Sequence, residues 1–84
     1  MKIVVYTTSN CIYCTRVKQL FDKAELEYTS YLVGEDITKE ALEKKYPLAK
    51  GYPYVIIDGK EIPGLQATAK YLVDKGYASK LRSK

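Results

Sequence analysis

Cys11 and Cys14 are the two cysteines of this chain, and the chain contains no histidine. Thiols at this spacing suit thiol–disulfide exchange, in which a thiolate attacks a disulfide and a second thiol resolves the mixed disulfide. A helix that begins near Cys11 would point unpaired backbone N–H groups at the first sulfur, favour the thiolate and lower the pKa of Cys11. Cys14, about one helical turn further on, would face inward as the resolving thiol. Cα atoms at this spacing lie about 5–6 Å apart on a helix, which is within the usual range for a disulfide.

Two other interpretations of the cysteine pair stay open on the residues alone. A structural zinc site needs four nitrogen or sulfur ligands, so this pair would need a second chain to complete one. An inert, buried pair of cysteines is the other alternative, and it leaves the polar turn Thr8-Ser9-Asn10 directly before the pair unexplained. Exchange chemistry accounts for both the pair and the turn.

The residues on either side of the cysteines predict a strand followed by a helix. Residues 2–7 form a β-branched and aromatic run that is typical of a buried central strand. Asn10 is the predicted N-cap of a helix over residues 11–24. That helix has one apolar stripe with three- and four-residue steps, and Arg16 and Lys18 are among the residues that lie off it.

Two further strands and a short helix follow in the pattern. Residues 26–33 have β-rich composition and predict a second strand. Thr38 is the predicted N-cap of a short helix that ends before Pro47, with Ile37 and Leu42 packed across its start. Residues 54–57 form the most apolar strand after the first.

The last third of the chain predicts a hairpin and a helix. Asp58-Gly59 indicates a type I′ turn into a short strand at residues 60–62. The break at Pro63-Gly64 precedes an amphipathic helix over residues 65–73, with Gly76 as its C-terminal stop. The predicted fold is therefore α/β, in the order β-α-β-α-β-β-α, with one parallel crossover and one antiparallel hairpin.

Pro53 stands at the start of the strand 54–57, where the missing N–H of a proline is tolerated. An ordinary trans proline that initiates the strand is one interpretation. A cis Tyr52-Pro53 bond is the other, since cis prolines occur as deliberate features of tight turns.

The composition predicts one small, soluble domain. The chain has 84 residues, 46% of them hydrophobic, and a net charge of +4. Two cysteines are too few for a disulfide-rich secreted scaffold, and residues 1–6 do not resemble a signal peptide, so a reducing cytoplasm is expected. No run approaches the length of a membrane span, and no nucleic-acid recognition motif accompanies the charge.

Four basic residues close the chain with no acidic neighbour after Asp74, namely Lys75, Lys80, Arg82 and Lys84. They form either a solvated, frayed terminus or a docking patch for an acidic partner protein.

Three stretches together resemble the glutaredoxins, a branch of the thioredoxin-fold redoxins. Residues 6–21 are similar to the family's Cys-Pro-Tyr-Cys followed by x-Arg-x-Lys-x-Leu. Residues 51–59 are similar to its Thr-Val-Pro-x-x-Phe-Ile-x-Gly, and residues 62–65 to its Ile-Gly-Gly-aromatic. The likeness covers roughly residues 2–73 and implies one domain over 1–76, a four-stranded mixed sheet flanked by helices, and a basic tail over 77–84.

The resemblance also implies roles for single residues. Cys11 is the nucleophile and Cys14 the resolver, Tyr13 borders the substrate groove, and Pro53 is cis beside the cysteines. The backbone of Tyr52 is expected to pair with glutathione or a protein substrate in the manner of an added strand. The Gly64-Leu65 backbone is expected to receive the γ-glutamyl carboxylate of glutathione at a helix N-terminus.

The implied activity is that of a monomeric, glutathione-dependent disulfide oxidoreductase that acts on protein disulfides or glutathione mixed disulfides and binds no metal. The chain departs from the family pattern at Ile12, where a proline is usual, and at Pro63, where a glycine is usual. Thr8 replaces a common lysine, and Gln66 and Ala67 stand where an acidic residue is common. Each lost charge-assisted contact to glutathione is worth roughly 1.5–3 kcal/mol, and Lys50 is a candidate substitute cation.

Two further functions stay open, and the departures favour the first of them and speak against the second. The first is a glutaredoxin-like redoxin that is rereduced by thioredoxin reductase and donates electrons to ribonucleotide reductase. The second is a glutaredoxin that binds an iron–sulfur cluster between two chains.

Overall fold

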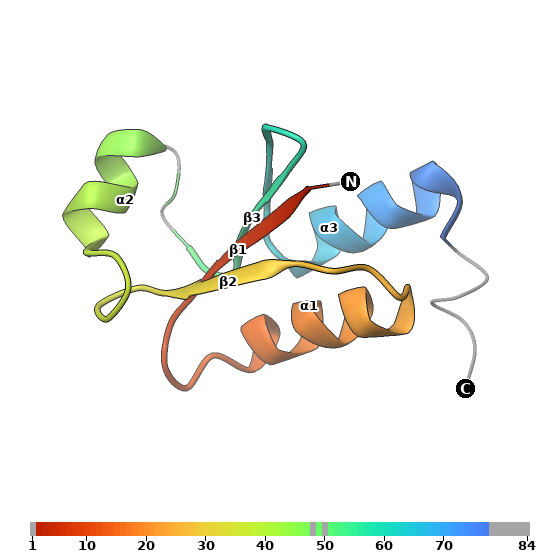
Figure 1. The fold of residues 1–84 in the computed structure, drawn as a ribbon, viewed down its shortest axis with the longest axis horizontal. Helices are drawn as coiled ribbons and strands as arrows, with labels where there is room; N and C mark the ends of the chain where they lie inside the picture. Colours follow the sequence, from red (N-terminus) through yellow and green to blue (C-terminus); the bar gives the residue numbers. More distant parts are fainter. Residues whose placement is uncertain (1, 48, 50, 78–84) are drawn as a thin grey trace.

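A computed structural model of the chain describes residues 2–47, 49 and 51–77. Four strands form one sheet in the order β2-β1-β3-β4, and helices lie on both sides of it (Figure 1). Along the chain the elements are β1 (Ile3–Thr7), α1 (Ile12–Lys23), β2 (Thr29–Leu32), α2 (Lys39–Lys45), β3 (Tyr54–Ile57), β4 (Lys60–Pro63) and α3 (Leu65–Leu72). This is the predicted order, on a thioredoxin-like fold.

The pairing of the strands confirms the mixed sheet. β1 is central and pairs in parallel with β2 and antiparallel with β3, and β4 adds antiparallel to the other edge of β3. The turn between β3 and β4 has φ of 51° at Asp58 and 82° at Gly59, and the two positive values are those of a type I′ turn. The crossover and the hairpin are both as predicted.

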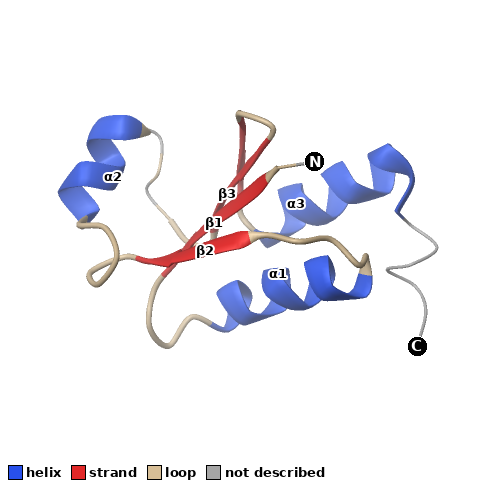
Figure 2. Ribbon diagram, viewed as in Figure 1, coloured by secondary structure: helices blue, strands red, loops and turns tan. Residues whose placement is uncertain are grey.

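One face of the sheet forms the larger apolar core with α1 and α3. Alternate residues of β1, such as Val5, and of β3, such as Val55, point to this side. Val17 and Phe21 of α1 and Leu72 of α3 cover them, all fully buried. The two helices also pack against each other (Figure 2). This layer holds α1, and with it the cysteine pair, against the sheet.

The opposite face packs on α2. Leu42 of α2 meets Tyr6, Tyr54 and Ile56 of the sheet in a second core cluster. The hydroxyl of Tyr54 donates to the Glu61 carboxylate across the hairpin. Burial, then the bond to Glu61, raise the pKa of Tyr54 to about 12, so this hydroxyl stays protonated at an alkaline pH at which an ordinary tyrosine ionises.

A short polar side chain caps the start of α2, and a glycine with left-handed backbone follows α3. Thr38 Oγ1 accepts the Ala41 N–H at 3.0 Å, which confirms Thr38 as the N-cap of α2. After α3 the chain continues in a π-helical turn, Val73–Tyr77, in which Gly76 has φ of 95°. This left-handed conformation is the one expected of Gly76 as a helix stop.

The predicted strand over 26–33 is wrong at its start. The chain leaves α1 through Glu25, which has φ of 60°, and the Leu26 N–H donates to the Phe21 carbonyl at 2.9 Å. Leu26 and Tyr28 then pack onto the first core, and β2 begins only at Thr29. The β-rich composition of residues 26–28 therefore reflects burial at a helix exit.

Several predictions fall on residues that the structure does not describe. Lys50 and nearly all of the basic tail over 77–84 lie outside the described residues, so the boundary of the domain at residue 76 stays a prediction. Within the described part of the chain, no helix is long and apolar enough to cross a membrane.

The packing of Phe21 predicts a large effect of its truncation. Its side chain is fully buried in the first core and its ring centroid lies 5.4 Å from that of Tyr28. We expect Phe21→Ala to lower the free energy of unfolding by about 3–5 kcal/mol, because it leaves a cavity between α1 and the sheet. Urea unfolding followed by circular dichroism measures this. The exposed Gln19→Ala on the same helix is the control and should stay within about 0.5 kcal/mol. A loss below about 1 kcal/mol for Phe21→Ala would contradict the packing described.

Candidate active site

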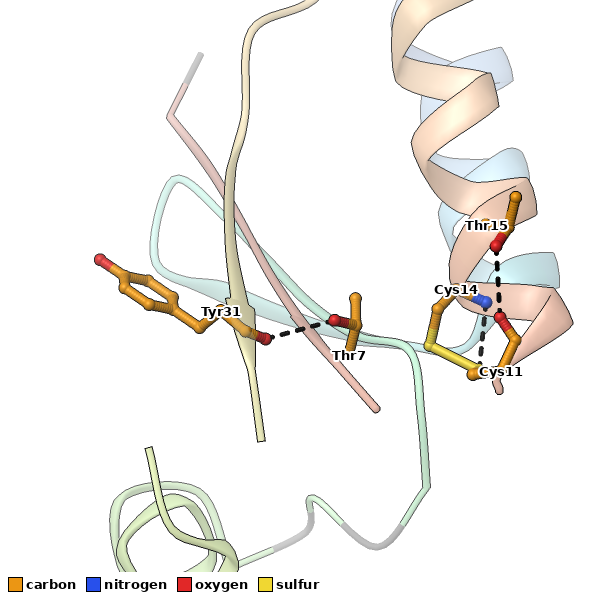
Figure 3. Close-up of a disulfide and its surroundings, with 5 residues drawn as sticks. All are labelled: Thr7, Cys11, Cys14, Thr15 and Tyr31. Carbon is orange, nitrogen blue, oxygen red and sulfur yellow. Dashed lines mark hydrogen bonds between the residues drawn. A yellow bond between two sulfur atoms is a disulfide. The ribbon is translucent and has the colours of Figure 1, made fainter. Parts of the chain in front are cut away.

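The two cysteines form a disulfide at the start of α1 (Figure 3). Their Cα atoms lie 5.2 Å apart, which confirms the separation predicted from the spacing. Cys14 is 3% exposed and packs inward, whereas Cys11 is more accessible. The outer cysteine is therefore the more accessible of the two, and the inner cysteine is bonded to it from the buried side.

Cys11 itself is the N-cap of α1, so the prediction of Asn10 as the cap is wrong. Asn10 has φ of 58°, in the left-handed region, whereas an N-cap residue has extended backbone. Cys11 has that extended backbone, and its Sγ accepts the Cys14 N–H at 3.2 Å. Asn10 instead makes the turn that brings the chain from β1 to the helix, a conformation that asparagine tolerates.

The hydrogen bonds of Cys11 tie the nucleophile candidate to the first turn of α1. The Thr15 N–H and the Thr15 hydroxyl both donate to the Cys11 carbonyl oxygen, with donor–acceptor distances of 3.3 and 3.5 Å. The Cys14 N–H and the N-terminal end of α1 are thus directed at the Cys11 sulfur, an arrangement that in general favours a thiolate over a thiol. The strand before the turn is anchored as well, since the buried Thr7 hydroxyl donates to the Tyr31 carbonyl at 3.4 Å (Figure 3).

The loop before β3 contains the cis peptide bond Tyr52-Pro53, which confirms the sharper of the two interpretations of Pro53. The Gly64 N–H donates to the Pro53 carbonyl at 3.0 Å, so this loop is bonded to the residue that precedes α3. Gly64 has φ of 88°, and its carbonyl accepts the Thr68 N–H and hydroxyl in the first turn of α3. A backbone hydrogen bond thus connects the loop that contains the cis proline to the N-terminus of α3.

Two hollows open beside the cysteines. The first, of about 530 Å³, is called the cysteine hollow and is lined by Thr7, Thr8, Asn10, Cys11, Ile12, Cys14, Thr15, Lys18 and Leu32. The second, of about 710 Å³, is called the proline hollow and is lined by Tyr13, Arg16, Tyr52, Pro53, Pro63, Gly64, Leu65, Gln66 and Ala67. Residues 11–14 contribute to both hollows, so the disulfide segment lies between them.

The proline hollow brings together every predicted binding residue. Tyr13, Tyr52, Pro53, Gly64 and Leu65 all line it, although they come from α1, the loop before β3 and the start of α3. Tyr13 is 55% exposed, and Pro53 is fully buried beneath the surface of the hollow. The two cysteines line the cysteine hollow instead. The seven predicted residues therefore form one continuous region.

Two charged residues of this region were missed in the sequence. Arg16 lines the proline hollow and Lys18 lines the cysteine hollow, although the pattern assigned both to the side of the helix away from the core. Helical spacing could have indicated both positions. Arg16 follows Tyr13 by three residues and Lys18 follows Cys14 by four, so Arg16 lies on the same side of α1 as Tyr13, and Lys18 on the same side as Cys14.

The sulfur atoms are the reactive groups that this region offers. Within the described residues, no group of three or more His, Cys, Asp or Glu side chains is arranged to hold a metal ion. An accessible sulfur, a second sulfur within bonding distance and an adjacent hollow supply what an exchange of thiols for a disulfide requires. The fold and the cysteine pair place the chain among the small thioredoxin-like redoxins.

Comparison with known proteins narrows this class to one family. Residues 3–62 match the model of the family described as Glutaredoxin. The chain belongs to the glutaredoxin family, whose members are generally thiol–disulfide oxidoreductases, and the resemblance seen in its motifs is confirmed.

Individual relatives agree with this assignment. The chain is 35% identical over 66 residues to glutaredoxin 1 of Rickettsia bellii, a match that covers 74% of this chain and 67% of that protein. Reduced Escherichia coli glutaredoxin superimposes with a TM-score of 0.74 at 28% identity and covers 88% of this chain and 95% of its own. A buckwheat glutaredoxin, solved as a complex with glutathione, has a TM-score of 0.73 at 29% identity and covers 94% of this chain and 74% of its own.

Proposed function

We propose that this protein is a dithiol glutaredoxin that reduces protein disulfides or glutathione mixed disulfides through Cys11 and Cys14, with glutathione as its reductant. The observation that carries the proposal is the hydrogen bond from the Cys14 N–H to Cys11 Sγ at 3.2 Å, with Cys14 buried behind it. An N–H group directed at the outer sulfur favours its thiolate, which is the attacking species.

The exchange takes place in two displacements. The Cys11 thiolate attacks one sulfur of the substrate disulfide, the new bond joins the two proteins, and the other substrate sulfur leaves as a thiolate that takes up a proton. Cys14 then loses its proton and attacks Cys11, so the second substrate thiol is released and the Cys11–Cys14 disulfide forms. Two protein thiols are oxidised and one disulfide is reduced. Two glutathione thiols reverse this change and become glutathione disulfide.

The proline hollow is proposed to hold the substrate during these steps. Tyr13 forms one wall, and the Tyr52 backbone, before the cis proline, pairs with the peptide portion of the substrate. The backbone at Gly64 and Leu65, where α3 begins, binds the γ-glutamyl carboxylate, which accepts hydrogen bonds from N–H groups at the helix N-terminus. The support for these roles is that all of these residues line one hollow and that a relative of similar fold was solved in complex with glutathione.

We further propose that the protein works as a monomer in the cytoplasm, on protein substrates that carry disulfides. A reducing compartment allows the pair to cycle, whereas an oxidising one would keep it in the disulfide form. Neither membrane nor nucleic acid takes part in this function.

Removal of the outer thiol tests the exchange directly. We expect Cys11→Ser to reduce a glutathione mixed disulfide no faster than the reaction without protein, because the attacking sulfur is gone. The assay couples glutathione disulfide formation to NADPH oxidation through glutathione reductase. Ser30→Ala, on the exposed strand β2, is the matched control and should keep the wild-type rate. A Cys11→Ser variant with full activity would refute the assignment.

A second function is supported by the uncharged residues around the hollows. Thr8 lines the cysteine hollow, and Gln66 and Ala67 line the proline hollow, so none of them offers a charge to glutathione. Charge-assisted hydrogen bonds are worth roughly 1.5–3 kcal/mol each, and two such losses weaken glutathione binding by orders of magnitude. The alternative is a redoxin that thioredoxin reductase rereduces and that delivers electrons to ribonucleotide reductase.

The electron source separates the two functions. We expect the oxidised protein to be rereduced by glutathione at a rate well above that of a simple monothiol such as 2-mercaptoethanol, compared at equal thiolate concentration. The measurement follows the disappearance of the Cys11–Cys14 disulfide after an acid quench, with thioredoxin reductase and NADPH in a parallel arm. A glutathione rate equal to that of the monothiol, with fast turnover by thioredoxin reductase, would replace the first function by the second.

A further inference from the structure

The charged residues that line the two hollows, within the described part of the chain, are both basic. Arg16 is the charged residue among those that line the proline hollow, and Lys18 is its counterpart in the cysteine hollow. Neither hollow has a carboxylate among its described lining residues. The first turns of α1 and α3, which begin at this end of the molecule, also contain no acidic side chain.

Each hollow has an exposed apolar residue of α1 beside its cation. Ile12 is 61% exposed and Tyr13 is 55% exposed, and they are the two most exposed large hydrophobic residues in the described part of the chain. Ile12 lines the cysteine hollow and Tyr13 the proline hollow. Cys11 therefore lies next to two exposed apolar residues, and each of the two hollows has one cation among its described lining residues.

From this arrangement we propose that the protein selects protein substrates whose reducible cysteine has an acidic residue on each side of it in the sequence. One carboxylate lies toward Arg16 in the proline hollow, the other toward Lys18 in the cysteine hollow, and Ile12 and Tyr13 contact the backbone and apolar side chains between them. The inference rests on the exchange reaction proposed above and leaves its electron balance unchanged: two protein thiols are oxidised as one substrate disulfide is reduced.

Glutathione matches this surface less well than such a segment. It has two carboxylates and one ammonium group, and the proline hollow contains a guanidinium but no described carboxylate for that ammonium. An acidic protein segment presents negative charge to both hollows with no ammonium to accommodate. The surface thus favours a polypeptide over the small thiol as the disulfide substrate.

The expected advantage is one of rate and depends on salt. Arg16 is exposed and Lys18 is half-buried, so each ion pair with a substrate is weak by itself. Two positive charges near the reacting sulfur still steer an acidic partner toward it, and they raise the association rate by about tenfold or more at low ionic strength. Salt at 1 M shortens the screening length to about 3 Å and should remove the advantage.

Three disulfide-cyclised peptides of equal length test the proposal. They differ in the residues that flank each cysteine, which are Glu, Gln or Lys. The prereduced protein is mixed with each peptide at low salt, quenched with acid, and the reduced peptide is quantified by chromatography. Each rate is divided by the rate of the same peptide with dithiothreitol, which corrects for the reactivity of its disulfide. The Glu peptide should react about tenfold or more faster than the Lys peptide, with the Gln peptide between them.

Two double variants identify the responsible charges. Arg16→Gln with Lys18→Gln should bring the Glu-to-Lys rate ratio close to one, while the rate of the Gln peptide reports any change in the cysteines themselves. Lys23→Gln with Lys44→Gln removes the same charge from exposed positions that line neither hollow, and should keep most of the ratio.

Equal normalised rates for the Glu and Lys peptides would overturn the inference and leave the exchange function intact. A ratio that persists in the Arg16 and Lys18 double variant would also overturn it. If no peptide is reduced by the wild-type protein, the proposed function itself fails, so the two failures are distinguishable.

Discussion

Tyr6, Tyr54 and Pro63 lie opposite one another on three adjacent strands, and this register assembles the site. Because β1 and β3 are antiparallel, the end of β1 that leads to Cys11 lies beside the start of β3, where Pro53 stands. Because β4 is antiparallel to β3, its end and the start of α3 lie at the same edge. Three segments that are far apart in the sequence therefore meet at one end of the sheet. A shift of one residue in this register would turn every side chain to the opposite face.

The register is fixed by burial on both faces of the sheet. β1 is the central strand, with Ile3 and Val5 facing α1 and α3, and Tyr6 facing α2. Since both faces are covered, a strand shifted by one residue would turn each side chain to the wrong face and lose apolar contacts with the helices on both sides. The exposed residues of the site contribute little to this packing. Substitutions of Ile12, Gln66 or Ala67, which are all exposed, should therefore change the charge and size of the site with little effect on the fold.

The order of the elements was predictable because each has a local signal. The helix stripe that includes Val17 and Phe21, the Asp58-Gly59 turn and the Thr38 cap are all encoded within a few residues. Ends of elements were less predictable. Asn10 and Glu25 adopt left-handed backbone, and composition alone does not distinguish a cap from a turn or a helix exit from a strand. The cis isomer of Pro53 followed from the family motif, since local propensity favours trans.

The chemistry of the cysteine pair was predictable from its spacing, whereas the charges around it were not. Arg16 and Lys18 lie off the apolar stripe of α1. Helical spacing places them on the same sides as Tyr13 and Cys14, but it does not show that a hollow borders those sides. Whether either side meets bulk water or a substrate hollow depends on the neighbouring segments. In this fold the loop at Pro53 and the start of α3 approach α1 near Arg16, and the ends of β1 and β2 approach it near Lys18.

The central claim is that Cys11 attacks and Cys14 resolves, and trapping the mixed disulfide tests it most directly. Cys14→Ser and Cys11→Ser variants are each incubated with an excess of a disulfide peptide, alkylated and examined by intact-protein mass spectrometry. We expect a stable peptide adduct on Cys11 in the Cys14→Ser variant and almost none in the Cys11→Ser variant. An adduct that accumulates on Cys14 in the Cys11→Ser variant, with none on Cys11 in the Cys14→Ser variant, would contradict this assignment.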